Sequence, residues 1–198
     1  MARSLRILVI GAAFLAGLVL CLGAVLMLSG RLSAPVAQQV AAIGGPFKLV
    51  DQNGQTLTDA DLKGHPFLVF FGFTHCPDVC PTTLFDVSEV LRSLGPDADR
   101  TRALFITVDP ERDTPPVMKD YLSSFDPHLS GLTGDPAAIA AVAKAYRVYY
   151  KKVSLDQGGY TMDHTAIVYL MDKDGRFVAP FSRKRTTEAA AADLRRYL

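Results

Sequence analysis

The stretch Pro66-Phe-Leu-Val-Phe-Phe-Gly-Phe-Thr-His-Cys-Pro-Asp-Val-Cys-Pro81 joins the most apolar strand-like segment of the chain to a pair of cysteines. Residues 66–73 are apolar on both faces, as expected of a central strand that is covered on both sides. Cys76 and Cys80 follow directly, ahead of a helix that an apolar stripe predicts over residues 82–94. The stretch therefore predicts a buried central strand whose following loop and first helical turn carry two thiols.

The spacing of the two cysteines suits redox or soft-metal chemistry. Residues four apart on a helical turn share a face, with Cβ atoms about 5–6 Å apart, which is close enough for one metal ion or one strained disulfide. Backbone N–H groups in a first turn are unpaired and stabilise thiolate, the form that binds metal and attacks disulfides. Pro77 and Pro81 fit this position, because a first turn tolerates proline and a helix interior does not.

The other patterns predict a mixed α/β domain. Asn-Gly between apolar runs signals a β-hairpin, here over residues 47–57, and buried strands are predicted over 102–109 and 165–171. This order suits a thioredoxin-like α/β sandwich with an extra N-terminal β-hairpin and inserted strands. Further helices are expected over 114–125, 136–146 and 188–197, and a last strand over 176–181 after the turn 172–175.

The N-terminus predicts the compartment of this domain. Residues 7–28 form an uncharged run of 22 residues, long enough as a helix at about 1.5 Å per residue to span a bilayer's hydrocarbon core. Arg3 and Arg6 precede the run and favour a cytoplasmic N-terminus, although Arg31 beyond it weakens the asymmetry. We therefore expect a single-pass membrane protein whose C-terminal domain lies in the periplasm of a bacterium or an equivalent outer compartment.

A cleaved signal peptide is the alternative, but its apolar region is usually about 7–15 residues long and ends at a small-x-small site. A lipoprotein is disfavoured, because Leu20 precedes Cys21 where acylation signals need a small residue. The predicted organisation is an anchor over residues 1–30, a linker over 31–45 and one thioredoxin-like, metal-binding domain over 46–198.

Charge argues against a nucleic-acid partner. All 20 acidic residues lie after Arg31, so residues 32–198 carry 18 basic against 20 acidic side chains, a net charge of −2. Nucleic-acid-binding domains instead carry a basic patch or stripe. The sequence therefore points away from nucleic acid.

His164 is the candidate third ligand. It stands beside Asp163 at the predicted start of a strand that a thioredoxin-like topology places opposite the cysteine loop. A histidine at a strand start is more often structural than a ligand, and this alternative stays open on spacing alone. His75 is the rival ligand, but neighbours in sequence point in different directions on a turn, so it is less favoured beside Cys76 than His164 is. The remaining histidines, His65 and His128, are interpreted as loop residues.

The donor set favours copper. Two thiolates and one imidazole suit copper, whereas structural zinc nearly always takes four ligands. Cu(I) suits two sulfurs and one nitrogen, while Cu(II) would need a more tetragonal site with an added oxygen or water. The alternative without metal is a structural disulfide, because an outward-facing domain is oxidising. A bridge between Cys76 and Cys80 closes a tiny loop, however, and would stabilise little.

Four separated segments resemble the Sco/SenC family: residues 71–81, 107–115, 132–134 and 160–165. The resemblance covers residues 44–198 and the N-terminal anchor. It implies a membrane-tethered, thioredoxin-fold copper chaperone that serves assembly of the binuclear copper centre of cytochrome c oxidase.

Carried over residue by residue, the resemblance implies copper ligation by Cys76, Cys80 and His164, with a Cys76–Cys80 disulfide when the pair is oxidised. The implied partners are the copper-bearing subunit of the oxidase and a copper donor protein. The oxidising compartment adds a thioredoxin-like reductase, which must reduce the thiols before they hold Cu(I). One departure is Thr82-Thr83, where many relatives have an acidic residue; it alters the partner surface and leaves the ligands intact.

The acidic residues after strand 102–109 have two interpretations. Open α/β sheets place functional groups in such loops, so one interpretation is that this loop supports the ligating imidazole or docks a partner through Asp109, Glu111, Arg112 and Asp113. Asp163, beside His164, would then act on the imidazole in the same way as Asp109. The alternative is an ordinary solvated turn in which Asp113 or Thr114 caps the next helix.

A thiol–disulfide oxidoreductase or a redox sensor would use the same cysteines without metal. Thioredoxin-like reductases use Cys-x-x-Cys and a proline before the later strand, whereas this chain has an extra residue between its cysteines and Asp163-His164 at the proline's place. A peroxiredoxin would need Thr or Ser where Phe73 stands. We therefore expect a metal-binding protein first, with thiol–disulfide exchange as its one enzymatic alternative.

Overall fold

The computed structural model describes residues 2–32, 42–156, 158–182 and 185–198, in two compact units, Met1–Val40 and Ala41–Leu198. The first unit contains a single long helix, α1 (Ala2–Leu32). Its stretch Val9–Met27 is long and apolar enough to cross a membrane, which fits the predicted anchor.

The second unit begins before residue 46, the predicted start of the domain. Gly44 donates its backbone N–H to the carbonyl oxygen of Ala145 at 3.0 Å, and Ile43 packs against the hydrophobic core. The predicted linker 31–45 therefore overlaps the folded elements at both ends, and its centre lies outside the described residues.

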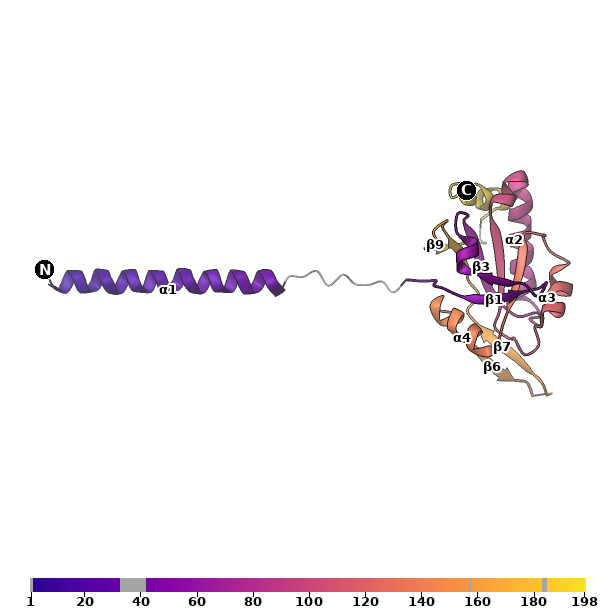
Figure 1. Ribbon diagram of the computed structural model, residues 1–198, viewed down its shortest axis with the longest axis horizontal. Helices are drawn as coiled ribbons and strands as arrows, with labels where there is room; N and C mark the ends of the chain where they lie inside the picture. Colours follow the sequence, from indigo (N-terminus) through magenta and orange to yellow (C-terminus); the bar gives the residue numbers. More distant parts are fainter. Residues whose placement is uncertain (1, 33–41, 157, 183–184) are drawn as a thin grey trace. The chain divides into compact units, whose positions relative to one another are not determined.

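A seven-stranded mixed sheet forms the centre of this unit, in the order β2-β1-β5-β4-β3-β8-β9 (Figure 1). The predicted central strand is β3 (Phe67–Gly72), which pairs in parallel with β4 (Arg102–Thr107) and antiparallel with β8 (Val168–Met171). The other strands are β1 (Lys48–Asp51), β2 (Thr56–Thr58), β5 (Leu129–Thr133) and β9 (Phe177–Pro180).

Both faces of β3 are buried, as predicted. Phe70 stacks on Phe105 with ring centroids 6.1 Å apart, whereas Phe71 contacts Tyr146 with centroids 5.4 Å apart. Successive side chains of a strand point to opposite faces, so these contacts lie on two sides of the sheet. The covering helices are α2 (Val79–Leu94), α3 (Pro115–Leu122), α4 (Pro136–Ala145) and α5 (Thr187–Arg195).

The helix α2 begins at Val79, earlier than the predicted residue 82, with Asp78 at the N-cap position. Cys80 and Pro81 thus lie in its first turn, where backbone N–H groups have no partner within the helix. The proline therefore costs no helical hydrogen bond, which is why the helix starts before it.

The inserted strands form a hairpin of their own. β6 (Tyr150–Ser154) pairs antiparallel with β7 (Tyr160–His164) in a second, two-stranded sheet. His164 is therefore the last residue of β7 and not the first of the next strand, which begins at Val168. The prediction of a strand over 165–171 was wrong at its start, because residues 165–167 join β7 to β8 and Thr165 donates its backbone N–H to the carbonyl oxygen of Tyr149 instead of pairing with β3.

Candidate metal centre

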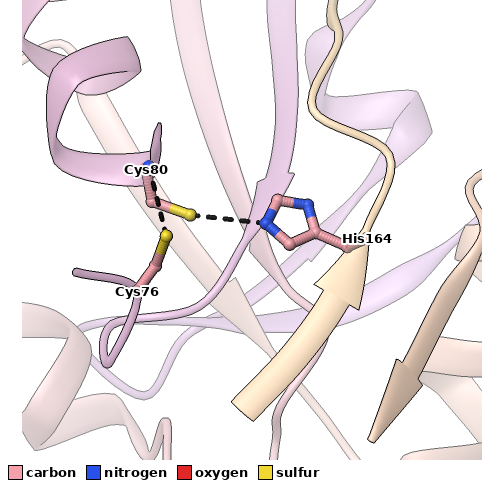
Figure 2. A group of neighbouring side chains, drawn as sticks. All are labelled: Cys76, Cys80 and His164. Carbon is pink, nitrogen blue, oxygen red and sulfur yellow. Dashed lines mark hydrogen bonds between the residues drawn. The ribbon is translucent and has the colours of Figure 1, made fainter. Parts of the chain in front are cut away.

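Two cysteines and one histidine converge beyond the end of β3. One ligand atom of each of Cys76, Cys80 and His164 lies within 4.8 Å of the others, and Cys80 Sγ is 3.6 Å from Nε2 of His164. Figure 2 shows the three side chains directed toward one another, two from the start of α2 and its preceding loop and one from the end of β7. Both cysteines are buried and His164 is half-buried. The structure thus brings together the trio proposed from the sequence.

Cys80 reaches this position because β3 ends in a glycine. A Cβ atom at Gly72 would lie 2.8 Å from Cys80 Sγ and 2.7 Å from a ring carbon of Phe105. The thiol and the ring therefore occupy the space that any other side chain at residue 72 would need. Beyond the strand, Cys76 donates its backbone N–H to the carbonyl oxygen of Phe73 at 3.2 Å, and Cys80 donates its own to Cys76 Sγ at 3.4 Å.

A buried carboxylate, Asp113, holds the loop in front of the cysteines. It accepts hydrogen bonds from the backbone N–H of Thr74 at 3.0 Å and from the hydroxyls of Thr74 and Thr107 at 2.6 Å each. Asp113 is 0% exposed, so these donors replace the water that a carboxylate would otherwise bind. The solvated-turn interpretation is therefore wrong for Asp113, and Thr114 takes the N-cap position of α3 without a side-chain cap bond.

The hydrogen bonding of His164 leaves one ring nitrogen for a ligand. Nδ1 lies 3.2 Å from the carbonyl oxygen of Thr165. Because a carbonyl oxygen only accepts, the neutral ring carries its proton on Nδ1 and directs the lone pair of Nε2 toward Cys80. The rings of Phe70 and Phe73 meet the imidazole edge-on, at centroid distances of 6.2 and 5.7 Å. This bonding pattern is the one that metal-ligating histidines use.

Burial controls the protonation of two of the three groups. It lowers the pKa of His164, against the opposing effects of the hydrogen bond to Thr165 and the charge of Asp163, so the imidazole is neutral near pH 7. Burial also raises the pKa of the Cys80 thiol, which outweighs its hydrogen bond from the backbone of Phe73. At Cys80 the effect of burial is therefore opposite to the predicted stabilisation of the thiolate by helix N–H groups, and it is the larger of the two. A bound metal would displace that proton.

The other histidines lie apart from this group. His75, the rival ligand, has a side chain that is 53% exposed, and its Nδ1 lies 3.0 Å from the Thr74 hydroxyl. His128 pairs with Asp126 and Asp99, while His65 contacts a backbone carbonyl.

The acidic residues expected to orient the histidine differ in position. Asp109 is 2% exposed and binds Arg112 and the Tyr160 hydroxyl, so it is neither solvated nor in hydrogen-bond contact with the imidazole. Asp163 is exposed and acts on His164 through its charge. The sequence pointed to Arg112 as a residue of this functional loop, but not to its partner Tyr160, because their contact joins residues 48 positions apart.

The site opens to solvent through a cavity of about 290 Å³ that Cys76 and His164 line together with Phe73 and Met162. A small ion can enter there, while Cys80 lies buried behind the rim. Two thiols and a neutral imidazole, with ligand atoms already within 4.8 Å of one another, fit a soft ion such as copper.

Comparison with known proteins finds both similar sequences and similar solved structures. A bovine (Bos taurus) protein, "Protein SCO2 homolog, mitochondrial", is 43% identical over 166 residues, covering 82% of this chain and 62% of its own length. The structure of Bradyrhizobium japonicum ScoI with copper bound is 70% identical, covers 79% of this chain and 100% of that chain, and has a TM-score of 0.78. The structure of yeast Sco1 with copper bound is 36% identical, covers 79% and 88%, and has a TM-score of 0.70.

These likenesses confirm the thioredoxin-like fold of the second unit and the resemblance seen in the motifs. The family model described as SCO1/SenC matches residues 35–198, which is most of the chain. The chain belongs to the SCO1/SenC family.

Proposed function

We propose that this protein is a membrane-anchored copper metallochaperone that binds one copper ion through Cys76, Cys80 and His164 and supports assembly of the binuclear copper centre of cytochrome c oxidase. The observation that carries the proposal is the convergence of three ligand atoms within 4.8 Å, from segments 84 residues apart. Copper bound to relatives that are 70% and 36% identical supports the choice of metal.

The geometry suits a site that both takes up and releases its ion. Cu(I) accepts two thiolates and one imidazole without further ligands, and the same site could hold Cu(II) if an added oxygen completes a tetragonal set. Cys76 and His164 line the open cavity, so a partner's ligands can approach the ion from that side. On binding, copper takes the place of the thiol protons, and the ring of His164 needs no proton change because it is already neutral.

The proposed topology places the C-terminal domain in the periplasm or an equivalent outer compartment, with the apolar run 7–28 as a retained anchor and the N-terminus cytoplasmic. The helix α1 and its apolar stretch Val9–Met27 support the anchor. The proposed partners are the copper-bearing oxidase subunit, a copper donor protein and a thioredoxin-like reductase. The reductase follows from chemistry, since a Cys76–Cys80 disulfide would form in an oxidising compartment and holds no copper.

Thiol–disulfide exchange is the second candidate function, as reduction of a partner or as redox sensing. It is favoured by the backbone N–H of Cys80, which donates to Cys76 Sγ at 3.4 Å and so places the two cysteines side by side. Exchange would need only these thiols. Copper delivery would need His164 as well, so the histidine separates the two functions.

The test uses the full-length chain in detergent and the isolated copper-binding domain of the oxidase subunit as acceptor. Chaperone loaded with Cu(I) is mixed with reduced, copper-free acceptor, and copper on the acceptor is measured after separation. In a parallel arm, reduced copper-free chaperone is mixed with oxidised acceptor, and the acceptor's free thiols are measured. We expect His164→Ala to lose copper transfer and to keep thiol reduction. Thiol reduction without copper transfer by the parent would assign the protein to the second function.

A further inference from the structure

The hairpin that carries His164 depends on contacts outside itself for its position. β6 and β7 form a separate two-stranded sheet, and His164 is the last residue of β7. A two-stranded hairpin alone is marginally stable in water. A metal ligand, however, must be held within a few tenths of an ångström of its productive position, about 0.5 Å in designed sites. The contacts that fix the hairpin therefore decide where His164 lies.

The first strong contact is a closed ring of three residues at the beginning of β7. Tyr160 donates its hydroxyl to Asp109 Oδ1 at 2.9 Å, and Arg112 donates Nε–H to Asp109 Oδ2. Arg112 also donates Nη1–H to the backbone carbonyl of Tyr160 at 3.1 Å, and its guanidinium carbon lies 3.8 Å from the centroid of the Tyr160 ring. Each of the three residues thus contacts the other two, and together they join the loop after β4 to β7, the strand that carries His164.

The carboxylate at the centre of these contacts is shielded from water, and the other two side chains are partly buried. Asp109 is 2% exposed and the Arg112 side chain 24% exposed. Charge-assisted hydrogen bonds are stronger than neutral ones, and a guanidinium over an aromatic face adds an attraction that grows with desolvation.

A second contact between the same segments is weaker and serves as a control. Lys152 on β6 pairs with Glu111 of the loop, but their side chains are 44% and 61% exposed. Exposed ion pairs contribute little to stability because solvent screens them. Loss of this pair should therefore leave the hairpin in place.

Arg112 also lies beside Phe73, the aromatic residue on which the His164 imidazole packs. Its guanidinium carbon lies 5.9 Å from the centroid of the Phe73 ring. Phe73 in turn meets His164 edge-on, with an interplanar angle of 90°. The arginine thus contacts both the strand that carries the histidine and the aromatic ring that the histidine packs on.

We propose that Arg112, held by Asp109 and Tyr160, is a positioning residue that keeps His164 within copper-bonding distance of Cys76 and Cys80. This rests on the proposed copper function of the site. Without the guanidinium, the start of β7 keeps the bond from the Tyr160 hydroxyl to Asp109 but loses the bond to the Tyr160 carbonyl and the guanidinium over the Tyr160 ring. The site then keeps its two sulfurs, while the nitrogen ligand is no longer held in place.

The experiment is a double-mutant cycle in the full-length chain in detergent. Cys21→Ser is present throughout, so that Cys76 and Cys80 are the two remaining thiols of the three in the chain. Parent, Arg112→Gln, His164→Ala and the double variant are titrated with Cu(I) against a competing chelator. Glu111→Gln is the matched control, and far-ultraviolet circular dichroism compares the fold of all variants.

We expect Arg112→Gln to weaken Cu(I) binding about 10–100-fold, as losses of outer contacts to metal-ligating histidines do. The same substitution should cause no further loss in the His164→Ala background, because no ligand remains to be positioned. X-ray absorption of copper-loaded Arg112→Gln should show the loss of the nitrogen ligand, as in His164→Ala. Glu111→Gln should bind copper like the parent.

Equal weakening by Arg112→Gln in both backgrounds would overturn the proposal, because the arginine would then act by charge or by folding. Unchanged affinity in Arg112→Gln would overturn it too, while the loss in His164→Ala would leave the copper function intact. If His164→Ala binds like the parent, the proposed function and this inference fail together. Should Arg112→Gln not fold, Tyr160→Phe takes its place, because it removes the hydroxyl bond to Asp109 and keeps the aromatic ring under the guanidinium. It should give a smaller loss of Cu(I) affinity, which again vanishes in the His164→Ala background.

Discussion

The Sγ atom of Cys80 lies 3.6 Å from Nε2 of His164, although 84 positions separate the two residues. The distance is set from two sides. Gly72 and the first turn of α2 place the sulfur, and the end of the β6–β7 hairpin places the nitrogen. A change on either side should alter copper binding without replacing any of the three proposed ligands.

Gly72→Ala should damage the cysteine side. Its Cβ would lie 2.8 Å from Cys80 Sγ, so the thiol or the strand must shift. We expect a loss of about 1–3 kcal/mol in the free energy of unfolding, as overpacking of a core usually causes, together with weaker Cu(I) binding. Urea unfolding and chelator competition measure the two effects. Gly45→Ala is the control, since its Cβ would meet Ala145 at 3.4 Å, and equal behaviour of the two variants would contradict the steric account.

Asp113→Asn should loosen the loop in front of Cys76. The new amide presents N–H groups to donors that now bind the carboxylate, the N–H and hydroxyl of Thr74 and the hydroxyl of Thr107. At least one buried donor then loses its partner, which costs about 1–3 kcal/mol or more. Urea unfolding should show this loss, and Asp120→Asn, at an exposed site on α3, should show none. Parent-like stability of Asp113→Asn would mean that the carboxylate does not hold the loop.

His128 should make the folded domain more stable in mild acid than in mild base. The hydrogen bond to Asp99 raises the pKa of His128 above its ordinary value of 6.5, with a further contribution from Asp126. A raised pKa stabilises the fold fully below the unfolded pKa, and this contribution is lost as the pH rises through the folded pKa. The stability difference between parent and His128→Asn should therefore be larger at about pH 5.5 than at about pH 8.5 in urea unfolding. A difference independent of pH would contradict this reading.

Oxidation should abolish copper binding reversibly. In the Cys21→Ser background, a Cys76–Cys80 disulfide would remove both thiolates, and an imidazole alone gives little selectivity for Cu(I). Oxidised protein should fail to compete with a Cu(I) chelator, and treatment with a thiol reductant should restore binding. Tight binding by protein shown by mass spectrometry to hold the disulfide would contradict the assignment of the sulfurs as ligands.

Much of the fold could be predicted because its core strands are apolar on both faces. Residues 66–73 indicate a central strand by composition alone, and β3 lies there. The helices α3, α4 and α5 lie where predicted, with ends that differ from the predicted ones by no more than three residues. The β6–β7 hairpin could not be predicted in the same way, because four of the five β6 side chains are exposed and carry no periodic signal.

Cys76, Cys80 and His164 could be proposed as ligands from the sequence, whereas the contacts that support them could not. Cysteine spacing and a lone histidine before an apolar run are local features. The roles of Asp113 and Arg112 depend on partners 39 and 48 positions away, Thr74 and Tyr160. No local pattern distinguishes the buried Asp113 and the partly buried Arg112 from solvated charges in a turn. Burial decides the difference, and burial is a property of the folded chain.

The central claim is that His164 completes a copper site with the two cysteines. The most direct measurement is a Cu(I) titration of the reduced full-length chain against a competing chelator, for the parent, His164→Ala and, as control, His75→Ala. We expect tight one-to-one binding by the parent and by His75→Ala, with a clear loss in His164→Ala. Equal affinity of His164→Ala and the parent would contradict it.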